Sequence, residues 1–264
     1  MALAEDQLEA THAIWDALAD FPASEADAAL MHLMECLSKL VAADNMIWVG
    51  AARIGHGVTA RRDGQLGWRA LVARHWRPGP TDHQISQRMI VDQDSEPSLT
   101  SQATARETGQ WRIHRLRDGW IDMKAFQRTS HYRISYLARG ITDRLFVGIP
   151  INQDAETIFL VDRYHDAPSF TPAQAKLVAY VMRGLKWFHR ELMLSHGLLL
   201  AGAPLSPMQR RIVRLMLTDR TEKEIAAELG QSPKTTHKYI TEICRRYGVR
   251  GRMGLMASWL NRQG

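Results

Sequence analysis

Between residues 206 and 247, residues that start and stop helices mark out three short helices in succession. Ser206-Pro207-Met208-Gln209 is typical of a helix start, and so is the capping box Thr221-Glu222-Lys223-Glu224. Gly230 suits the left-handed turn that ends the second helix, and Ser232-Pro233 begins the third helix soon afterwards. Two helices joined by so short a turn have the spacing of a helix-turn-helix.

The third of these helices has two faces of opposite character when its residues are laid out at about 100° per residue. The packing face consists of Thr236, Ile240, Ile243, Cys244 and Tyr247. The opposite face carries a cationic row, defined here as Lys234, Lys238, Thr241 and Arg245, with Thr235 and His237 beside it. Because a helix fits the major groove of B-DNA, where cations meet phosphates and base edges, we predict that these six side chains contact double-stranded DNA.

The net charge of the chain is concentrated in this segment. From residue 201 onward there are twelve Lys and Arg against five Asp and Glu, whereas the preceding residues carry twenty-two basic and twenty-three acidic side chains. A charged helix face is often only solvated, but a row on the second helix of a turn motif, inside the one basic segment, favours a polyanionic partner.

The same segment resembles the LuxR/GerE-type helix-turn-helix family. The resemblance covers Leu205 to about Leu260 and lies in these blocks: Leu205-Ser206-Pro207, residues 223–230 (KEIAAELG), residues 232–236 (SPKTT), Ile243 and Gly248-Val249-Arg250. It implies a four-helix domain whose third helix reads the major groove and whose last helix, about residues 252–260, often supports dimerisation. Gln209, Asp219 and residues 236–239 depart from the family's usual residues, so the operator sequence stays open.

The preceding residues predict an α+β domain. Residues 3–40 have helical periodicity, broken near Phe21-Pro22, and four β-rich runs follow, at residues 46–54, 66–76, 144–151 and 156–163. Turn residues between these runs, such as Gly55-His56-Gly57, suggest two hairpins. In residues 77–135 the sequence predicts no regular secondary structure except a polar helix near residues 100–108. An antiparallel sheet with flanking helices is therefore expected.

A capped helix is expected at the end of this domain, over about residues 171–200, because Thr171-Pro172-Ala173-Gln174 combines an N-cap, a proline and a capping glutamine. Tyr180, Gly184 and Trp187 lie on its far side, where a dimer seam or another part of the same domain could cover them. Gly202-Ala203-Pro204 has the composition of a linker. The expected domains are thus residues 1–200, for sensing and dimerisation, and 204–264.

The order of elements in the first domain is similar to that of GAF or PAS-like sensor domains. A phospho-receiver would begin with a strand ending in paired acids, whereas this chain begins with helix. An acyl-homoserine-lactone pocket would bring an Asp-Pro pair, whereas Arg144 follows Asp143. A ligand pocket could draw on several aromatic residues: Trp48, Trp68, Trp111, Trp120, Phe126, Tyr132 and Tyr136. Each of these is more readily a core residue, so cofactor-binding residues stay unknown.

Catalytic, metal and cofactor sites are not predicted. No nucleophile elbow, P-loop or paired-acid motif occurs, and His75, His114 and His131 lack the spacing of metal ligands. Cys36 and Cys244 lie in helical patterns and are expected to be reduced, buried thiols. No apolar run is long enough to span a bilayer. A cytoplasmic protein that is not an enzyme and has no membrane partner is expected.

The sequence thus predicts a dimeric, sequence-specific transcription regulator that binds an inverted-repeat operator. RNA polymerase and a small-molecule or protein effector are further candidate partners. Two alternatives stay open. One is a co-regulator or anti-activator that uses the turn motif to dock other proteins, and the other is a first domain derived from an enzyme.

Overall fold

A computed structural model describes residues 3–54, 57, 62–92, 97–199 and 204–260. The chain divides into two compact units, and each is described separately below. Residues 1–16 and 31–186 form the N-terminal unit, whereas residues 17–30 and 187–264 form the C-terminal unit. The expected linker at Gly202-Ala203 lies outside the described residues.

A five-stranded antiparallel sheet forms the middle of the N-terminal unit, in the order β2-β1-β5-β4-β3. The strands are β1 (Asn45–Arg53), β2 (Trp68–His75), β3 (Arg112–Arg115), β4 (Ile141–Pro150) and β5 (Ala155–Tyr164). The four expected β-rich runs coincide with β1, β2, β4 and β5, and both expected hairpins are confirmed. The turn residues Gly55 and His56 lie outside the described part of the chain.

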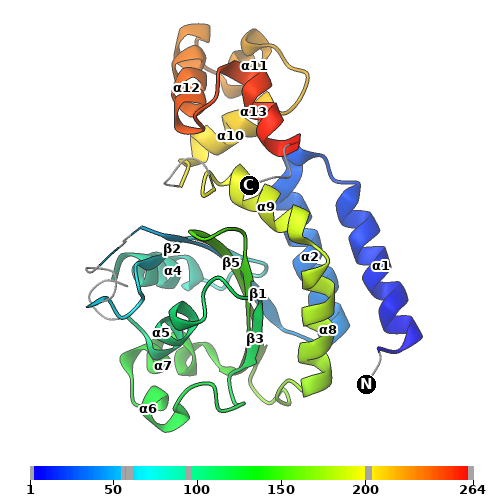
Figure 1. Cartoon of the computed structure of the whole chain (residues 1–264), viewed down its shortest axis with the longest axis vertical. Helices are drawn as coiled ribbons and strands as arrows, with labels where there is room; N and C mark the ends of the chain where they lie inside the picture. Colours follow the sequence, from blue (N-terminus) through cyan, green and yellow to red (C-terminus); the bar gives the residue numbers. More distant parts are fainter. Residues whose placement is uncertain (1–2, 55–56, 58–61, 93–96, 200–203, 261–264) are drawn as a thin grey trace. The chain divides into compact units, whose positions relative to one another are not determined.

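Helices cover both faces of this sheet (Figure 1). One face is covered by α8 (Pro172–Arg183) and by α2 (Ala26–Val41), which follows α1 (Glu5–Ala19) and a short 3₁₀ turn at Ala23–Glu25. The other is covered by α4 (Asp82–Asp92) and α5 (Leu99–Arg106). Most residues of β4 and β5 are consequently buried, on both faces. The expected antiparallel sheet with flanking helices is confirmed.

Two arginine–carboxylate pairs are buried in this sheet. Arg144 on β4 lies directly opposite Asp162 on β5, and its Nε and Nη2 donate to the two carboxylate oxygens at 2.5 and 2.7 Å. Arg112 on β3 makes a second two-pronged contact, with Glu156. Gly148 makes room for it, since a Cβ there would collide with the Arg112 guanidinium. Each buried charge thus has a bidentate partner, which offsets the cost of removing it from water.

The helix expected over residues 171–200 is interrupted. The capping box at Thr171 begins α8 as predicted, but the helix stops at Arg183 and a second helix, α9, runs over Lys186–Ser195. At the break, the ring of Trp15 of α1 lies where a Cβ of Gly184 would be, and its Nε1 donates to the carbonyl of Val181. Trp15 also stacks on Tyr180, so part of the same domain covers one of the two far-side aromatic residues.

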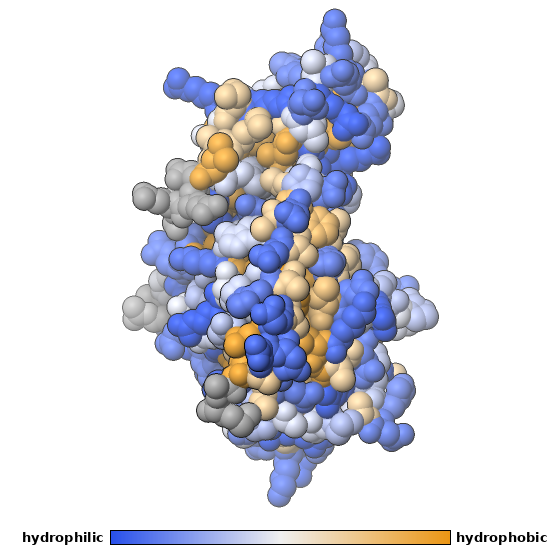
Figure 2. Space-filling view, turned by 90° about the vertical axis from the view of Figure 1, so that its right-hand side faces the viewer, coloured by the Kyte–Doolittle hydropathy of each residue, from blue (hydrophilic) through white to orange (hydrophobic). Residues whose placement is uncertain are grey.

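The surface over α1 is the one that Figure 2 presents, and an apolar band runs there between hydrophilic residues. Tyr180 remains 41% exposed beside Trp15.

No helix among the described residues has the length and apolar character needed to cross a membrane. Neither cysteine is bonded to the other: Cys244 is buried, as expected, whereas Cys36 is only half-buried.

The C-terminal unit is all helical. Besides residues 17–30, its described part contains α9 and the helices α10 (Pro207–Met216), α11 (Glu222–Leu229), α12 (Pro233–Arg246) and α13 (Gly251–Leu260). Their apolar faces meet in one core that includes Ile212, Ile225, Ile243 and Trp259. The three helix starts predicted at Ser206, Thr221 and Ser232 are confirmed, each with a side-chain oxygen that accepts a hydrogen bond from the first turn.

Candidate nucleic-acid interface and ligand pocket

The turn between α11 and α12 fixes how the second helix is presented. Thr221 caps α11 in a reciprocal capping box with Glu224, and Gly230 ends the helix with φ +63°. A residue with a side chain is strained in this left-handed conformation, which suits glycine. Ser232 then caps α12 by accepting from the backbone N–H of Thr235, and Pro233 occupies the first turn. Local residue chemistry therefore positions α12.

Packing beneath α12 leaves the predicted row on the outside. Thr236, Ile240, Ile243, Cys244 and Tyr247 are all buried, as the periodicity predicted. Tyr247 anchors the end of the helix, because its hydroxyl donates to the carbonyl of Leu194 at 2.5 Å, and burial raises the pKa of this phenol. Arg246 turns inward and donates to Gln209 at 2.7 Å.

All six predicted contact residues are exposed. The solvent-facing set is Lys234, Thr235, His237, Lys238, Thr241 and Arg245. Among the described residues, no ion pair involves the lysines and the arginine of this row. The cations are thus open to an external polyanion, and the buried side of the same helix is held by the core.

Two ion pairs lie around α11 and were not predicted from the sequence. His237 on α12 has its Nδ1 3.0 Å from Oε2 of Glu222, and Arg220 has its Nε 2.9 Å from Oε2 of Glu228. Glu222 was assigned only to the capping box. Its position at the start of α11, close to the beginning of α12 across a short turn, is the signal that could have indicated the contact with His237.

An exposed cationic helix that follows a short turn and rests on a small helical core defines a helix-turn-helix module. Residues 203–258 match the family model described as bacterial regulatory proteins, luxR family. The C-terminal domain is therefore a helix-turn-helix domain of that family. The spore germination protein GerE of Bacillus subtilis is 40% identical over 48 residues, which are 18% of this chain and 65% of that relative. The chain thus matches slightly under two thirds of the length of this relative.

Solved structures resemble longer stretches of the chain at low identity. The ligand-binding domain of VqsR from Pseudomonas aeruginosa has a TM-score of 0.48 at 12% identity, covering 72% of this chain and 98% of that one. SdiA in complex with octanoyl-rac-glycerol has a TM-score of 0.48 at 11% identity, covering 98% and 96%. Because both TM-scores lie below 0.5, the N-terminal unit must be interpreted from its own residues.

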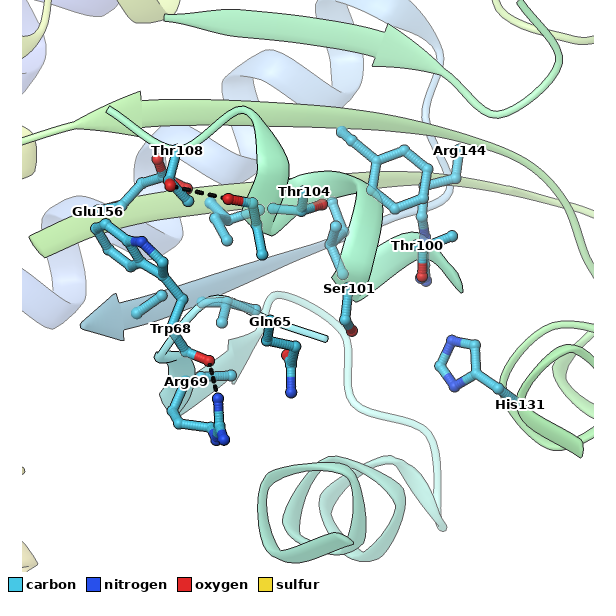
Figure 3. A pocket seen from close by; sticks show the side chains of 17 residues that line it. Gln65, Trp68, Arg69, Thr100, Ser101, Thr104, Thr108, His131, Arg144 and Glu156 are labelled. Atoms are coloured by element: carbon cyan, nitrogen blue, oxygen red, sulfur yellow. Dashed lines mark hydrogen bonds between the residues drawn. The ribbon is translucent and has the colours of Figure 1, made fainter. Parts of the chain in front are cut away.

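A pocket lies in the N-terminal unit between the sheet and α5 (Figure 3). Its volume is about 120 Å³. An apolar cavity of about 150 Å³ binds benzene, so this somewhat smaller pocket is in the size range of a single small molecule. Apolar side chains of the sheet form one wall: Val49, Ala51, Ala70, Phe146, Ile158 and Leu160. Of the seven aromatic residues considered from the sequence, only Trp68 lines the pocket, whereas Trp48, Phe126 and Tyr136 are fully buried core residues.

Hydroxyl groups of the α5 segment form the opposite wall. Thr100 and Thr104 lie one helical turn apart on the same side of α5, with Ser101 beside them, and Thr108 lines the pocket from the turn that follows the helix. Thr108 donates to the carbonyl of Ala105 at 2.9 Å. The pocket thus sets neutral hydrogen-bonding groups against an apolar sheet.

Charged groups that line the pocket already have partners. Arg144 is held by Asp162, Glu156 by Arg112, and Arg69 by Asp63 at 2.6 Å. His131 lies at the other end of the view from Trp68 and Glu156 (Figure 3). Burial, with a smaller effect of Arg144, lowers the pKa of His131 to about 4, so its imidazole is neutral near pH 7. The pocket therefore offers no uncompensated charge among its described residues.

The part of the chain that the structure describes shows no group of three or more His, Cys, Asp or Glu side chains arranged to hold a metal ion. His75 and His114 each contact another protein side chain. His75 Nε2 lies 2.7 Å from the hydroxyl of Ser86, and His114 Nε2 lies 2.6 Å from Oε2 of Glu107.

Proposed function

We propose that the chain is a transcription regulator that binds double-stranded DNA through α12. The observation that carries this proposal is the row of Lys234, Lys238 and Arg245 that stands exposed on the second helix of a luxR-family helix-turn-helix. Such a helix enters the major groove, where lysine and arginine bind phosphates and the acceptors of guanine. A protein that binds chromosomal DNA in this way acts in the bacterial cytoplasm.

Selection from a random double-stranded DNA library by the purified full-length chain tests the proposal. We expect wild type to enrich a sequence motif, and the double variant K238A/R245A to enrich none. The matched control is K124A/R128A, which removes two exposed cations from the N-terminal unit and should enrich the wild-type motif. If K238A/R245A retains wild-type enrichment, the assignment of α12 is wrong.

The same experiment distinguishes the alternative function. A co-regulator or anti-activator that uses this domain to dock proteins would enrich no sequence in either form. We include a homodimer in the proposal, because two copies of α12 would read half-sites about one helical turn apart. An inverted repeat in the enriched motif is the expected signature, and a single unrepeated half-site would contradict the dimer.

We further propose that the N-terminal unit is a sensor, of the GAF or PAS-like kind, whose pocket binds a small uncharged effector. The support is the composition of its walls: an apolar sheet faces the hydroxyls of Thr100, Thr104 and Thr108, and the ionic groups are already paired. A charged ligand would lose hydration without gaining a free counter-ion, whereas a neutral ligand with one polar group loses little.

Benzyl alcohol and benzoate form a matched pair of probes, because they share size and ring but differ in charge. We expect millimolar benzyl alcohol to raise the melting temperature of the full chain more than benzoate does. The variant T104V keeps the shape of the wall but removes a hydroxyl, and should reduce this shift. Equal shifts for both probes, or a larger one for benzoate, would contradict an uncharged effector.

A further inference from the structure

Beside the cationic row, one imidazole and one carboxylate face each other across the helix-turn-helix. Nδ1 of His237 on α12 lies 3.0 Å from Oε2 of Glu222, the first residue of α11. Both side chains remain open to solvent, His237 at 68% and Glu222 at 52%. The contact therefore lies on the surface and is not part of the packed core.

His237 flanks the row on the side of α11, because it is one residue, or about 100°, around the helix from Lys238. Glu222 is the acidic side chain in contact with its ring. An acid of α12 itself, Glu242, lies on the other flank and accepts from Nε2 of Gln209 at 3.3 Å. Of these two acids, Glu222 is the one that contacts a residue predicted to meet DNA.

The chemistry of the pair fixes the proton on the ring. An ionised carboxylate only accepts hydrogen bonds, so Nδ1 of His237 must donate to Glu222. A neutral imidazole has a single N–H group, and with that proton on Nδ1 the other nitrogen, Nε2, is an acceptor. In the neutral ring, Nε2, which does not contact Glu222, is thus a hydrogen-bond acceptor.

Resting on the DNA-binding function proposed above, we infer that Glu222 is a positioning residue that makes His237 a selector of one base. In the major groove, the hydrogen-bond donors are the exocyclic amines of adenine and cytosine, whereas guanine and thymine present acceptors on that edge. An acceptor at Nε2 therefore favours adenine or cytosine at one position of each half-site. The Glu222–His237 pair is a determinant of operator specificity in this chain.

Sequence selection from the random library by the purified full-length chain tests the inference. The variant E222Q should lower the preference for adenine or cytosine at one position about three- to tenfold, the value of one hydrogen bond, and leave the other positions unchanged. H237A should lose the preference at the same position. The matched control E228Q, which removes the acid paired with Arg220 on the same helix, should reproduce the wild-type motif.

An E222Q motif identical to that of wild type, or different positions affected by E222Q and H237A, would overturn the inference and leave the proposed function intact. Failure of wild type to enrich any sequence would instead overturn the proposed function itself.

Discussion

The sheet of the N-terminal unit and the helix α12 of the C-terminal unit use cationic side chains in opposite ways. In the N-terminal unit, Arg112 and Arg144 are buried in the sheet and are each held by a carboxylate through two hydrogen bonds. In the C-terminal unit, Lys238 and Arg245 stand exposed on α12. The first arrangement stabilises a fold, and the second leaves charge available to another molecule. Burial and ion pairing therefore decide whether a cationic side chain stabilises the fold or is available to bind another molecule.

The sharpest test of the first half of this comparison is to break one buried pair. D162N leaves the guanidinium of Arg144 buried without a counter-charge, so we expect a loss of about 3 to 5 kcal/mol in the free energy of unfolding. Urea unfolding followed by tryptophan fluorescence measures it. The exposed pair Glu35–Lys39 provides the control, since E35Q should leave the transition unchanged. Equal effects of D162N and E35Q would show that burial does not distinguish the pairs.

Burial of His131 in the N-terminal unit makes the stability of the protein depend on pH. Burial lowers its pKa from an ordinary 6.5 to about 4, so between these values the unfolded chain binds more protons than the folded chain does. Stability should therefore fall as the pH drops from 6.5 to 4, by about 3 kcal/mol from this group alone. H131N should be less acid-sensitive than wild type in thermal melts across that window. Parallel pH curves for the two proteins would refute this account of His131.

The helix caps give the smallest expected effect, and one that both units share. Thr171 and Thr221 each form a reciprocal capping box. T171A and T221A should each cost about 1 kcal/mol. Urea unfolding monitored by circular dichroism would detect these losses. If T221A proved neutral while T171A did not, the start of α11 would depend on tertiary packing and not on its cap.

Local signals account for what the sequence predicted well. Caps and turn glycines act over a few residues, so the starts of α10, α11 and α12 could be placed from Ser206, Thr221 and Ser232 alone. The face of α12 followed from periodicity, because its buried residues repeat at helical spacing. The exposed positions of Lys238 and Arg245 were predictable for the same reason.

The features that the sequence did not predict depend on contacts between residues that are far apart in the chain. Strand β3 has the residues Arg-Ile-His-Arg, which show no apolar pattern that would predict a strand. Arg112 can nevertheless be buried, because it pairs with Glu156, which is far away in the sequence. At the break after Arg183, Gly184 lies against the ring of Trp15, which is far away in the sequence. The pocket could not be located, since its walls come from separate strands and helices and include only one of the expected aromatic residues, Trp68.

The dependence of DNA affinity on salt tests the central claim most directly, because binding through exposed cations releases counter-ions from the phosphates. For the motif enriched by wild type, we predict that the logarithm of the association constant falls linearly with the logarithm of salt concentration. K238A/R245A should flatten that slope by about one to two, at roughly 0.9 per lost phosphate contact. A wild-type affinity independent of salt, or the same slope for both proteins, would contradict the claim that the exposed face of α12 binds DNA.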